Sequence, residues 1–170
     1  MNGINRYGRL PRRAAMAIGI ALAGLLTVSP GARAQDALEL ISPDERNVVT
    51  EGVVEGALVY ALERDGRKVL LPSRLGFEVR GAPALSEGLE ITGSERQATD
   101  QVWELPLGEV ALVREFHIEL RVSVAETGEP GRQFVVVFRA FDDGVAFRYE
   151  LPEQPGLGEF EIMDELTEFH

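Results

Sequence analysis

The 170-residue chain contains no cysteine. This absence excludes disulfide bonds, thiolate nucleophiles, cysteine-based zinc sites and a lipid-anchored N-terminal cysteine. Histidine is nearly as scarce: His117 and His170 are the only two, and no metal-binding or catalytic motif surrounds either of them. A Ser-His-Asp triad cannot be argued from their spacing. We expect His117 to be exposed to solvent, on the polar side of a strand.

Basic residues are also scarce relative to acidic ones. Five of the 17 lysines and arginines precede Gln35, whereas none of the 28 acidic residues do, so the remainder has a formal charge of 12 minus 28, or −16. Such a surface repels phosphate backbones and anionic lipids. We therefore expect no nucleic-acid partner and no role at a membrane surface.

Residues 1–34 have the pattern of a secretory signal peptide. Arginines between residues 6 and 13 precede an uncharged apolar run at 14–28, and Ala32-Arg33-Ala34 matches an A-x-A cleavage site. The run is shorter than the roughly 20 residues that span a bilayer. We expect export to the periplasm or beyond, a mature chain starting at Gln35 and no membrane attachment after cleavage. Arg12-Arg13 leaves twin-arginine export open beside general secretion.

After the leader, the sequence has no helix-period segment of useful length. Apolar residues alternate with polar ones in short runs that Gly, Pro and Asp separate, which is typical of antiparallel β-strands. Predicted strands occupy residues 38–41, 57–63, 68–71, 75–80, 89–93, 115–124, 133–139, 145–151 and 160–162. We expect one all-β domain at 35–170, an antiparallel β-sandwich that is incomplete within this chain. A catalytic barrel of about 250 residues would not fit.

Two of these segments are the most informative. At 115–124, five apolar residues alternate with Glu115, His117, Glu119, Arg121 and Ser123, which no helix would place on one face. Residues 134–138 are apolar on both faces and predict an interior strand. Asp-Gly pairs at 65–66 and 143–144 predict tight hairpin turns in which glycine accepts a positive φ.

Three features could carry chemistry or only structure. Asp142-Asp143 fit a hairpin turn better than a metal site, because Asp favours turns by bonding its own backbone. Trp103, the only tryptophan, would either stack on a sugar or belong to the core. Arg148 would form a cross-strand ion pair with a nearby carboxylate.

The stretch FRAFDDGVAFRYE, residues 138–150, resembles the N-terminal domain of glycoside hydrolase family 97, the bacterial α-glucosidases and α-galactosidases. The order of other segments agrees, and the resemblance covers nearly all of residues 35–170. These segments are Ser42-Pro43-Asp44, 66–73, 75–77, Trp103 with Gly108-Glu109, and 164–169. One departure is residues 114–120, REFHIEL, where the family usually has Tyr-Asn before Glu-Leu.

The resemblance implies a galactose mutarotase-like super-sandwich that packs on a catalytic (β/α)8 barrel. It implies no catalytic or metal-binding residue in this chain, because the hydrolytic acid and base lie beyond it. It implies no cofactor for this chain, and calcium for the full-length enzyme. The chain would be a carbohydrate-binding or scaffolding module of an exported enzyme that hydrolyses α-glucosides or α-galactosides, and would be inactive alone.

Within that module, Trp103 is the candidate sugar contact and Arg148 the candidate contact to the barrel. The expected partners are the barrel of the same polypeptide and carbohydrate. A free-standing secreted carbohydrate-binding or adhesion sandwich is the alternative, and a degraded gene product without function of its own is a third.

Overall fold

The computed structural model describes residues 37–104, 112–155, 157 and 160–170. The predicted leader and the Gly108-Glu109 pair lie outside the described residues. Ten β-strands form the described part: β1 (Leu38–Ile41), β2 (Asn47–Val54), β3 (Ala57–Arg64), β4 (Arg67–Arg74), β5 (Phe77–Val79), β6 (Leu89–Glu104), β7 (Leu112–Glu126), β8 (Gln133–Ala140), β9 (Val145–Glu150) and β10 (Ile162–Glu165). This part of the chain contains no helix long and apolar enough to cross a membrane.

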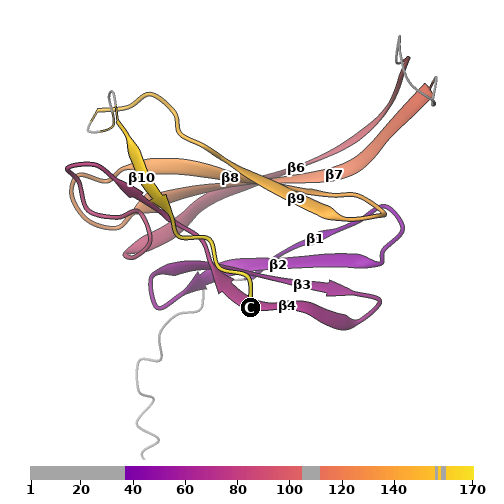
Figure 1. The fold of residues 1–170 in the computed structure, drawn as a ribbon, viewed down its shortest axis with the longest axis horizontal. Helices are drawn as coiled ribbons and strands as arrows, with labels where there is room; N and C mark the ends of the chain where they lie inside the picture. The colour runs from indigo at the N-terminus through magenta and orange to yellow at the C-terminus, as the bar shows by residue number, and fades with distance from the viewer. Residues whose placement is uncertain (1–36, 105–111, 156, 158–159) are drawn as a thin grey trace, which may run out of the picture. The chain divides into compact units, whose positions relative to one another are not determined.

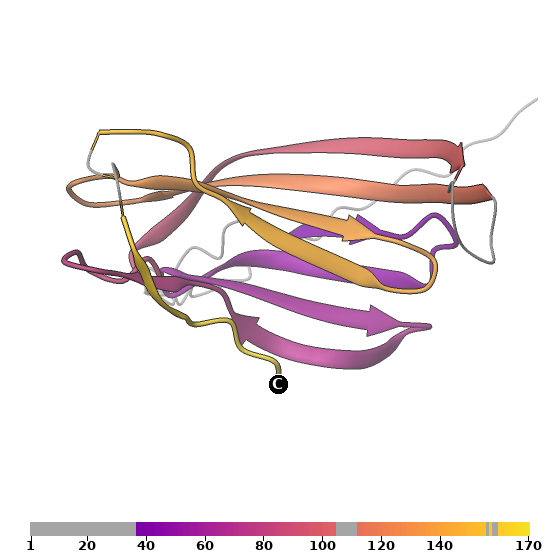
Figure 2. The same ribbon diagram turned by 45° about the horizontal axis from the view of Figure 1, so that its top comes forward.

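The strands form two four-stranded antiparallel sheets that lie face to face (Figures 1 and 2). The first sheet has the order β1-β2-β3-β4 and the second the order β6-β7-β8-β9, while β5 pairs with β10. Each of the two sheets is a meander, because strands that are neighbours in the sequence are also neighbours in the sheet. The prediction of an antiparallel β-sandwich is confirmed.

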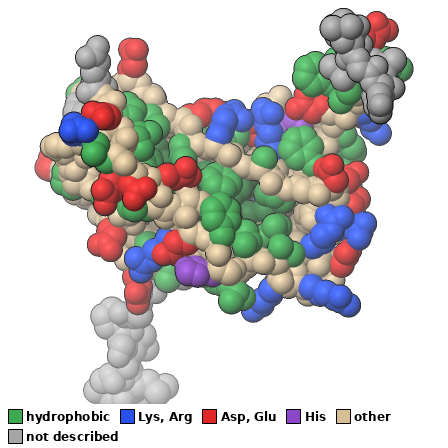
Figure 3. Space-filling model, in the orientation of Figure 1, with side chains coloured by type: hydrophobic (Ala, Val, Ile, Leu, Met, Phe, Trp, Pro, Cys, Tyr) green, Lys and Arg blue, Asp and Glu red, His purple; other side chains and the backbone are tan. Residues whose placement is uncertain are grey.

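The core lies between the two sheets and is rich in aromatic rings. Tyr60 of β3 lies 5.9 Å from Phe138 of β8 and 5.7 Å from Phe147 of β9, measured between ring centroids. Phe77 of β5 packs edge-on against Phe134 at 5.6 Å. Burial of each such side chain stabilises the fold by about 1.5–3 kcal/mol. Hydrophobic side chains also reach the surface between the sheets on the side shown in Figure 3.

Two hairpins have two-residue turns: the predicted one at Asp65-Gly66, and one at Glu55-Gly56 that was not predicted. Asp65 and Gly66 have φ angles of 52° and 71°, and Glu55 and Gly56, which join β2 to β3, have 52° and 80°. Positive φ at both positions matches the right-handed twist of the strands. At the β8–β9 turn the expectation was wrong in one respect, since Gly144 has no positive φ. That turn spans four residues, and the Phe141 N–H donates to the Gly144 carbonyl at 2.8 Å.

The strand predictions missed β2 and the length of β6. In β2, NVVTEGVV, adjacent valines and a central glutamate interrupt the alternation that marks a strand. The prediction ended at residue 93 although β6 continues to Glu104, because the second half of β6 is an exposed edge strand in which apolar and polar residues do not alternate. The last strand lies at Ile162–Glu165 instead of 160–162. Beyond it the chain follows β4, where the Leu71 N–H donates to the His170 carbonyl at 2.9 Å.

Candidate functional site

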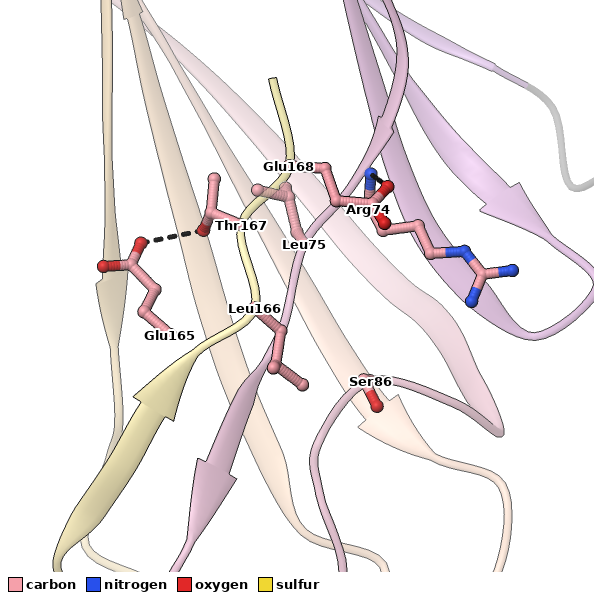
Figure 4. Close-up of a pocket in the computed structure, with 7 residues that line it drawn as sticks. All are labelled: Arg74, Leu75, Ser86, Glu165, Leu166, Thr167 and Glu168. Carbon is pink, nitrogen blue, oxygen red and sulfur yellow. Dashed lines mark hydrogen bonds between the residues drawn. The ribbon is translucent and has the colours of Figure 1, made fainter. Parts of the chain in front are cut away.

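A pocket of about 410 Å³ lies where the C-terminal segment crosses the β4–β5 connection (Figure 4). Its lining is Arg74, Leu75, Ser86 and residues 165–168. The chain's own donors occupy both carboxylates: Thr167 Oγ1 donates to Glu165 at 2.7 Å, and the Arg74 N–H donates to Glu168 at 2.9 Å. The latter bond is the main reason that the pKa of Glu168 is lowered. The pocket is therefore a junction that fastens the C-terminal segment.

The outer side of the second sheet carries a network of charged side chains, which we call the polar face: Glu115, His117, Glu119, Arg121, Arg139, Arg148 and Glu150. Arg139 Nε donates to Glu119 at 2.8 Å, and Arg121 pairs with both Glu119 and Glu150. Hydrogen bonds from Arg121, and next from Arg148, lower the pKa of Glu150. Three arginines match three glutamates, so the network is formally neutral.

His117 is buried, with 1% of its surface exposed, so the expectation of an exposed histidine was wrong. The ring of Phe141 lies 4.9 Å from its imidazole, and a Glu115 carboxylate oxygen lies 3.4 Å from Nδ1. Alternation along the strand correctly placed His117 opposite the core. It could not show that Phe141, in the turn after β8, would lie against this imidazole.

Arg148 pairs mainly within its own strand. Its guanidinium donates to Glu150, two residues further along β9, at 2.7 and 3.0 Å, whereas Glu119 of β7 is 3.9 Å away. The predicted ion pair exists, but its closer partner is a neighbour along the strand. Arg148 and Arg139 also line a hollow of about 220 Å³ with Phe141 and Ala146. The side chain is 44% exposed, so it is accessible to another protein surface.

Trp103 lies near the end of β6 and is 55% exposed, so of the two interpretations that the sequence left open, a core position is excluded. Trp103 pairs with Val113 of β7 in one row of residues across the sheet. Arg148 lies in another such row, in which it pairs with Val137 of β8, and Val137 pairs with Arg121 of β7. Eight residues of β7 separate these two rows, or about 27 Å at 3.4 Å per residue. The two candidate residues share one side of the sheet but form no common site. A sugar contact by Trp103 stays a prediction.

The acidic turn after β8 has a structural role. Asp142 accepts a hydrogen bond from the Asp44 N–H at 2.9 Å, and the Asn47 side chain donates to the Phe141 carbonyl at 2.7 Å. The turn thereby connects the second sheet to the β1–β2 connection of the first. Within the described residues, no three His, Asp or Glu side chains are placed to hold a metal ion together.

Sequence reasoning missed Glu51 of β2. Its side chain is 1% exposed, and neither carboxylate oxygen has a hydrogen-bond partner among the described residues. Burial raises the pKa of Glu51 to about 8. A single glutamate within an apolar strand, VVTEGVV, was the available signal, but the strand itself had not been recognised.

Comparison with known proteins matches the chain to one family. The model of the glycosyl-hydrolase 97 N-terminal domain matches residues 40–170. Among curated proteins, a "Probable retaining alpha-galactosidase" of Streptomyces bingchenggensis is 36% identical over 152 residues, covering 85% of this chain and 24% of the relative. A retaining α-galactosidase of Bacteroides thetaiotaomicron is 25% identical over 137 residues, covering 81% of this chain and 19% of the relative.

Solved structures give the same result. A glycoside hydrolase family 97 enzyme from a Pseudoalteromonas species, in complex with acarbose, is 36% identical with a TM-score of 0.75, covering 78% of this chain and 20% of that enzyme. A β-arabinopyranosidase is 29% identical with a TM-score of 0.70, covering 78% of this chain and 21% of that protein. The chain thus spans a quarter or less of the relatives that it matches.

Proposed function

Because the chain belongs to the glycosyl-hydrolase 97 N-terminal family, we propose that it is the N-terminal scaffolding and carbohydrate-associated module of an exported α-glycosidase. In this role it packs against the larger catalytic part and helps to form the wall of the sugar site. The observation that carries the proposal is coverage: the match extends over 85% of the chain but only 24% of the Streptomyces relative. That relative's name supports α-galactosides as substrates, with α-glucosides as the alternative.

The chain's own residues contribute structure to this enzyme and leave the hydrolysis to the catalytic part. Glycoside hydrolysis needs two carboxyl groups about 5–9.5 Å apart on either side of the scissile bond. The described carboxylates of the polar face and of the C-terminal pocket are instead engaged by arginines, hydroxyls or backbone donors. Calcium, if the enzyme uses it, would be bound in the catalytic part, since the described residues do not form a three-ligand set.

Export to the periplasm is part of the proposal. It rests on the arginine-rich start, the apolar run and the Ala32-Arg33-Ala34 site. Mass spectrometry of the N-terminus of the protein recovered from the periplasm tests it. A mature protein starting at Gln35 supports export, and an intact leader on protein confined to the cytoplasm contradicts it.

The DNA that follows the codon for His170 tests the module assignment. We expect an open reading frame for a catalytic barrel, and deletion of residues 35–170 from that longer polypeptide should abolish its soluble, active form. A stop codon at this position would contradict the proposal, and so would full activity after the deletion.

The exposure of Trp103 favours one alternative, a free-standing sugar-binding sandwich. In that case saccharides would change the fluorescence of Trp103, which is the only tryptophan of the chain. A saturable change with galactose or glucose oligosaccharides in the chain alone would favour the alternative. A flat titration favours the module.

A further inference from the structure

The second sheet does not have four strands along its whole length. β6 and β7 pair along their whole length, but β8 pairs with β7 only from Ile118 to Ala125. Residues Thr99–Glu104 of β6 and Leu112–His117 of β7 therefore form a two-stranded ribbon without a third strand among the described residues. Figure 1 shows β6 and β7 continuing past the β8–β9 turn.

The far end of this ribbon is apolar. Val102, Trp103 and Leu112 are 60%, 55% and 58% exposed, and we call these three side chains the apolar end. Figure 3 shows hydrophobic side chains at this place, at the upper right. Large apolar groups that lie together on a surface mark sites of contact with another protein or with a ligand.

The apolar end extends over both faces of the ribbon. Trp103 pairs with Val113, so these two side chains share the face that continues the polar face of the sheet. Val102 and Leu112, each one residue away, point to the opposite face because successive side chains of a strand alternate. A partner that covers all three must therefore receive the end of the ribbon between its own elements, since a flat surface would cover only one face.

The base of the ribbon is ordered by polar contacts that leave the apolar end uncovered. Arg114 donates two hydrogen bonds of 2.7 Å to Asp100 and lies over the Phe116 ring at 4.8 Å from its centroid. These contacts fix the direction of the ribbon. An isolated two-stranded hairpin is only marginally stable in water, so further stability must come from packing.

We propose that this ribbon is a docking arm, and that its apolar end inserts into the catalytic part of the same polypeptide. The proposal rests on the module function above, and it commits to that occupant because the relatives carry three quarters or more of their length outside the matched region. The charge of the arm supports contact with protein and not with a polyanion, since its described residues contain Asp100, Glu104 and Glu115 but only one lysine or arginine, Arg114.

Thiol labelling tests the arm, because the chain has no cysteine of its own. Single variants Val102→Cys and Leu112→Cys report on the apolar end. Gly128→Cys is the matched control: Gly128 is exposed in the β7–β8 loop, and a Cβ there would have nothing within 4 Å. Maleimide labelling of each site, followed by peptide mass spectrometry, is compared between this chain and the longer polypeptide that contains it.

We expect all three sites to react at similar rates in the chain alone. In the longer polypeptide the rates at 102 and 112 should fall at least tenfold, while the rate at 128 stays within about twofold. Unchanged rates at 102 and 112 would overturn the docking arm. Slow labelling in the chain alone, together with a dimer in gel filtration, would also overturn it by assigning the apolar end to a second copy.

A second measurement separates this inference from the module function. The longer polypeptide is cleaved by protease between the two parts and passed over a gel-filtration column. If the parts elute together while 102 and 112 label freely, the module function stands and only the arm fails. If the parts separate, the module function fails as well.

Discussion

The two halves of β7 differ in their surroundings although they belong to one continuous strand. From Ile118 to Ala125 the strand lies between β6 and β8, and Leu120, Val122 and Val124 are at most 1% exposed. From Leu112 to His117 only β6 pairs with it, and Leu112 is 58% exposed. Apolar and polar residues alternate from Glu115 to Val124, but not from Leu112 to Arg114. A strand pattern therefore predicts a strand, but neighbouring strands and distant side chains such as Phe141, which lies against His117, decide what is buried.

The ribbon can be compared with the rest of the two sheets, which we call the body, and the largest difference between them should appear in the pH dependence of the free energy of unfolding. Glu51 is buried in the body, and its pKa in the folded state is about 8, above its ordinary value of 4.5. The folded state thus binds the proton more tightly, so the free energy of unfolding should fall as pH rises from 4.5 through 8. A shift of this size corresponds to a loss on the order of 5 kcal/mol.

Urea unfolding of the chain at several pH values measures this loss. Glu51→Gln removes the titrating group and should flatten the profile above pH 5. Glu104→Gln, the same substitution at an exposed position of the ribbon, is the control. Its free energy of unfolding should depend on pH as that of the wild type does. Equal stability of the wild-type chain at pH 5 and pH 9 would contradict the burial of a protonated Glu51.

Paired phenylalanine truncations give the next largest contrast. Phe138 is fully buried and packs against Tyr60 and Phe147, so Phe138→Ala should cost about 3–5 kcal/mol. Phe116 belongs to the ribbon and contacts Arg114, so Phe116→Ala should cost about 1 kcal/mol or less. Urea midpoints measure both. Similar costs would mean that the ribbon is as tightly packed as the body.

Strand patterns predicted the body of the molecule better than its edges. Residues 134–138 were correctly assigned to an interior strand because apolar side chains on both faces require cover on both faces. The second half of β6 escaped prediction because an exposed edge strand needs no apolar alternation. Burial of His117 depends on Phe141, which is distant in the sequence, so no local pattern could show it.

The candidate site was less predictable than the fold. Trp103 and Arg148 are singled out by residue type, and the sequence does not reveal that one lies on a ribbon and the other within an arginine–glutamate network. Register between strands brings Arg148 close to Glu119, which is 29 residues away in the sequence. Only the order of strands in the sheet fixes such contacts.

Replacing the acidic partner of an arginine by its neutral amide gives a third, smaller contrast between the body and the ribbon. Glu119 is 8% exposed and accepts a hydrogen bond from Arg139, so Glu119→Gln should cost about 1–3 kcal/mol. Asp100 pairs with Arg114 on the exposed ribbon, where Asp100→Asn should cost less than about 1 kcal/mol. Thermal unfolding at low and high salt checks both. A larger loss at Asp100 would reverse the comparison.

Substitution of the exposed tryptophan should have the smallest effect on stability. Trp103→Ser in the chain alone should change the free energy of unfolding by about 0.5 kcal/mol or less, because the side chain is already half in water. In the longer polypeptide the same variant should destabilise the whole enzyme more, since the docking arm would lose an anchor. Unfolding curves of the two proteins show whether the effect depends on the catalytic part.

We propose above that this chain is a non-catalytic module of a family 97 glycosidase. The most direct test of this claim is hydrolysis of aryl α-galactosides and α-glucosides by the purified chain, with calcium supplied. We predict no turnover above the buffer blank. Turnover that follows the chain through purification would contradict the claim, because it would place a complete catalytic site within these residues.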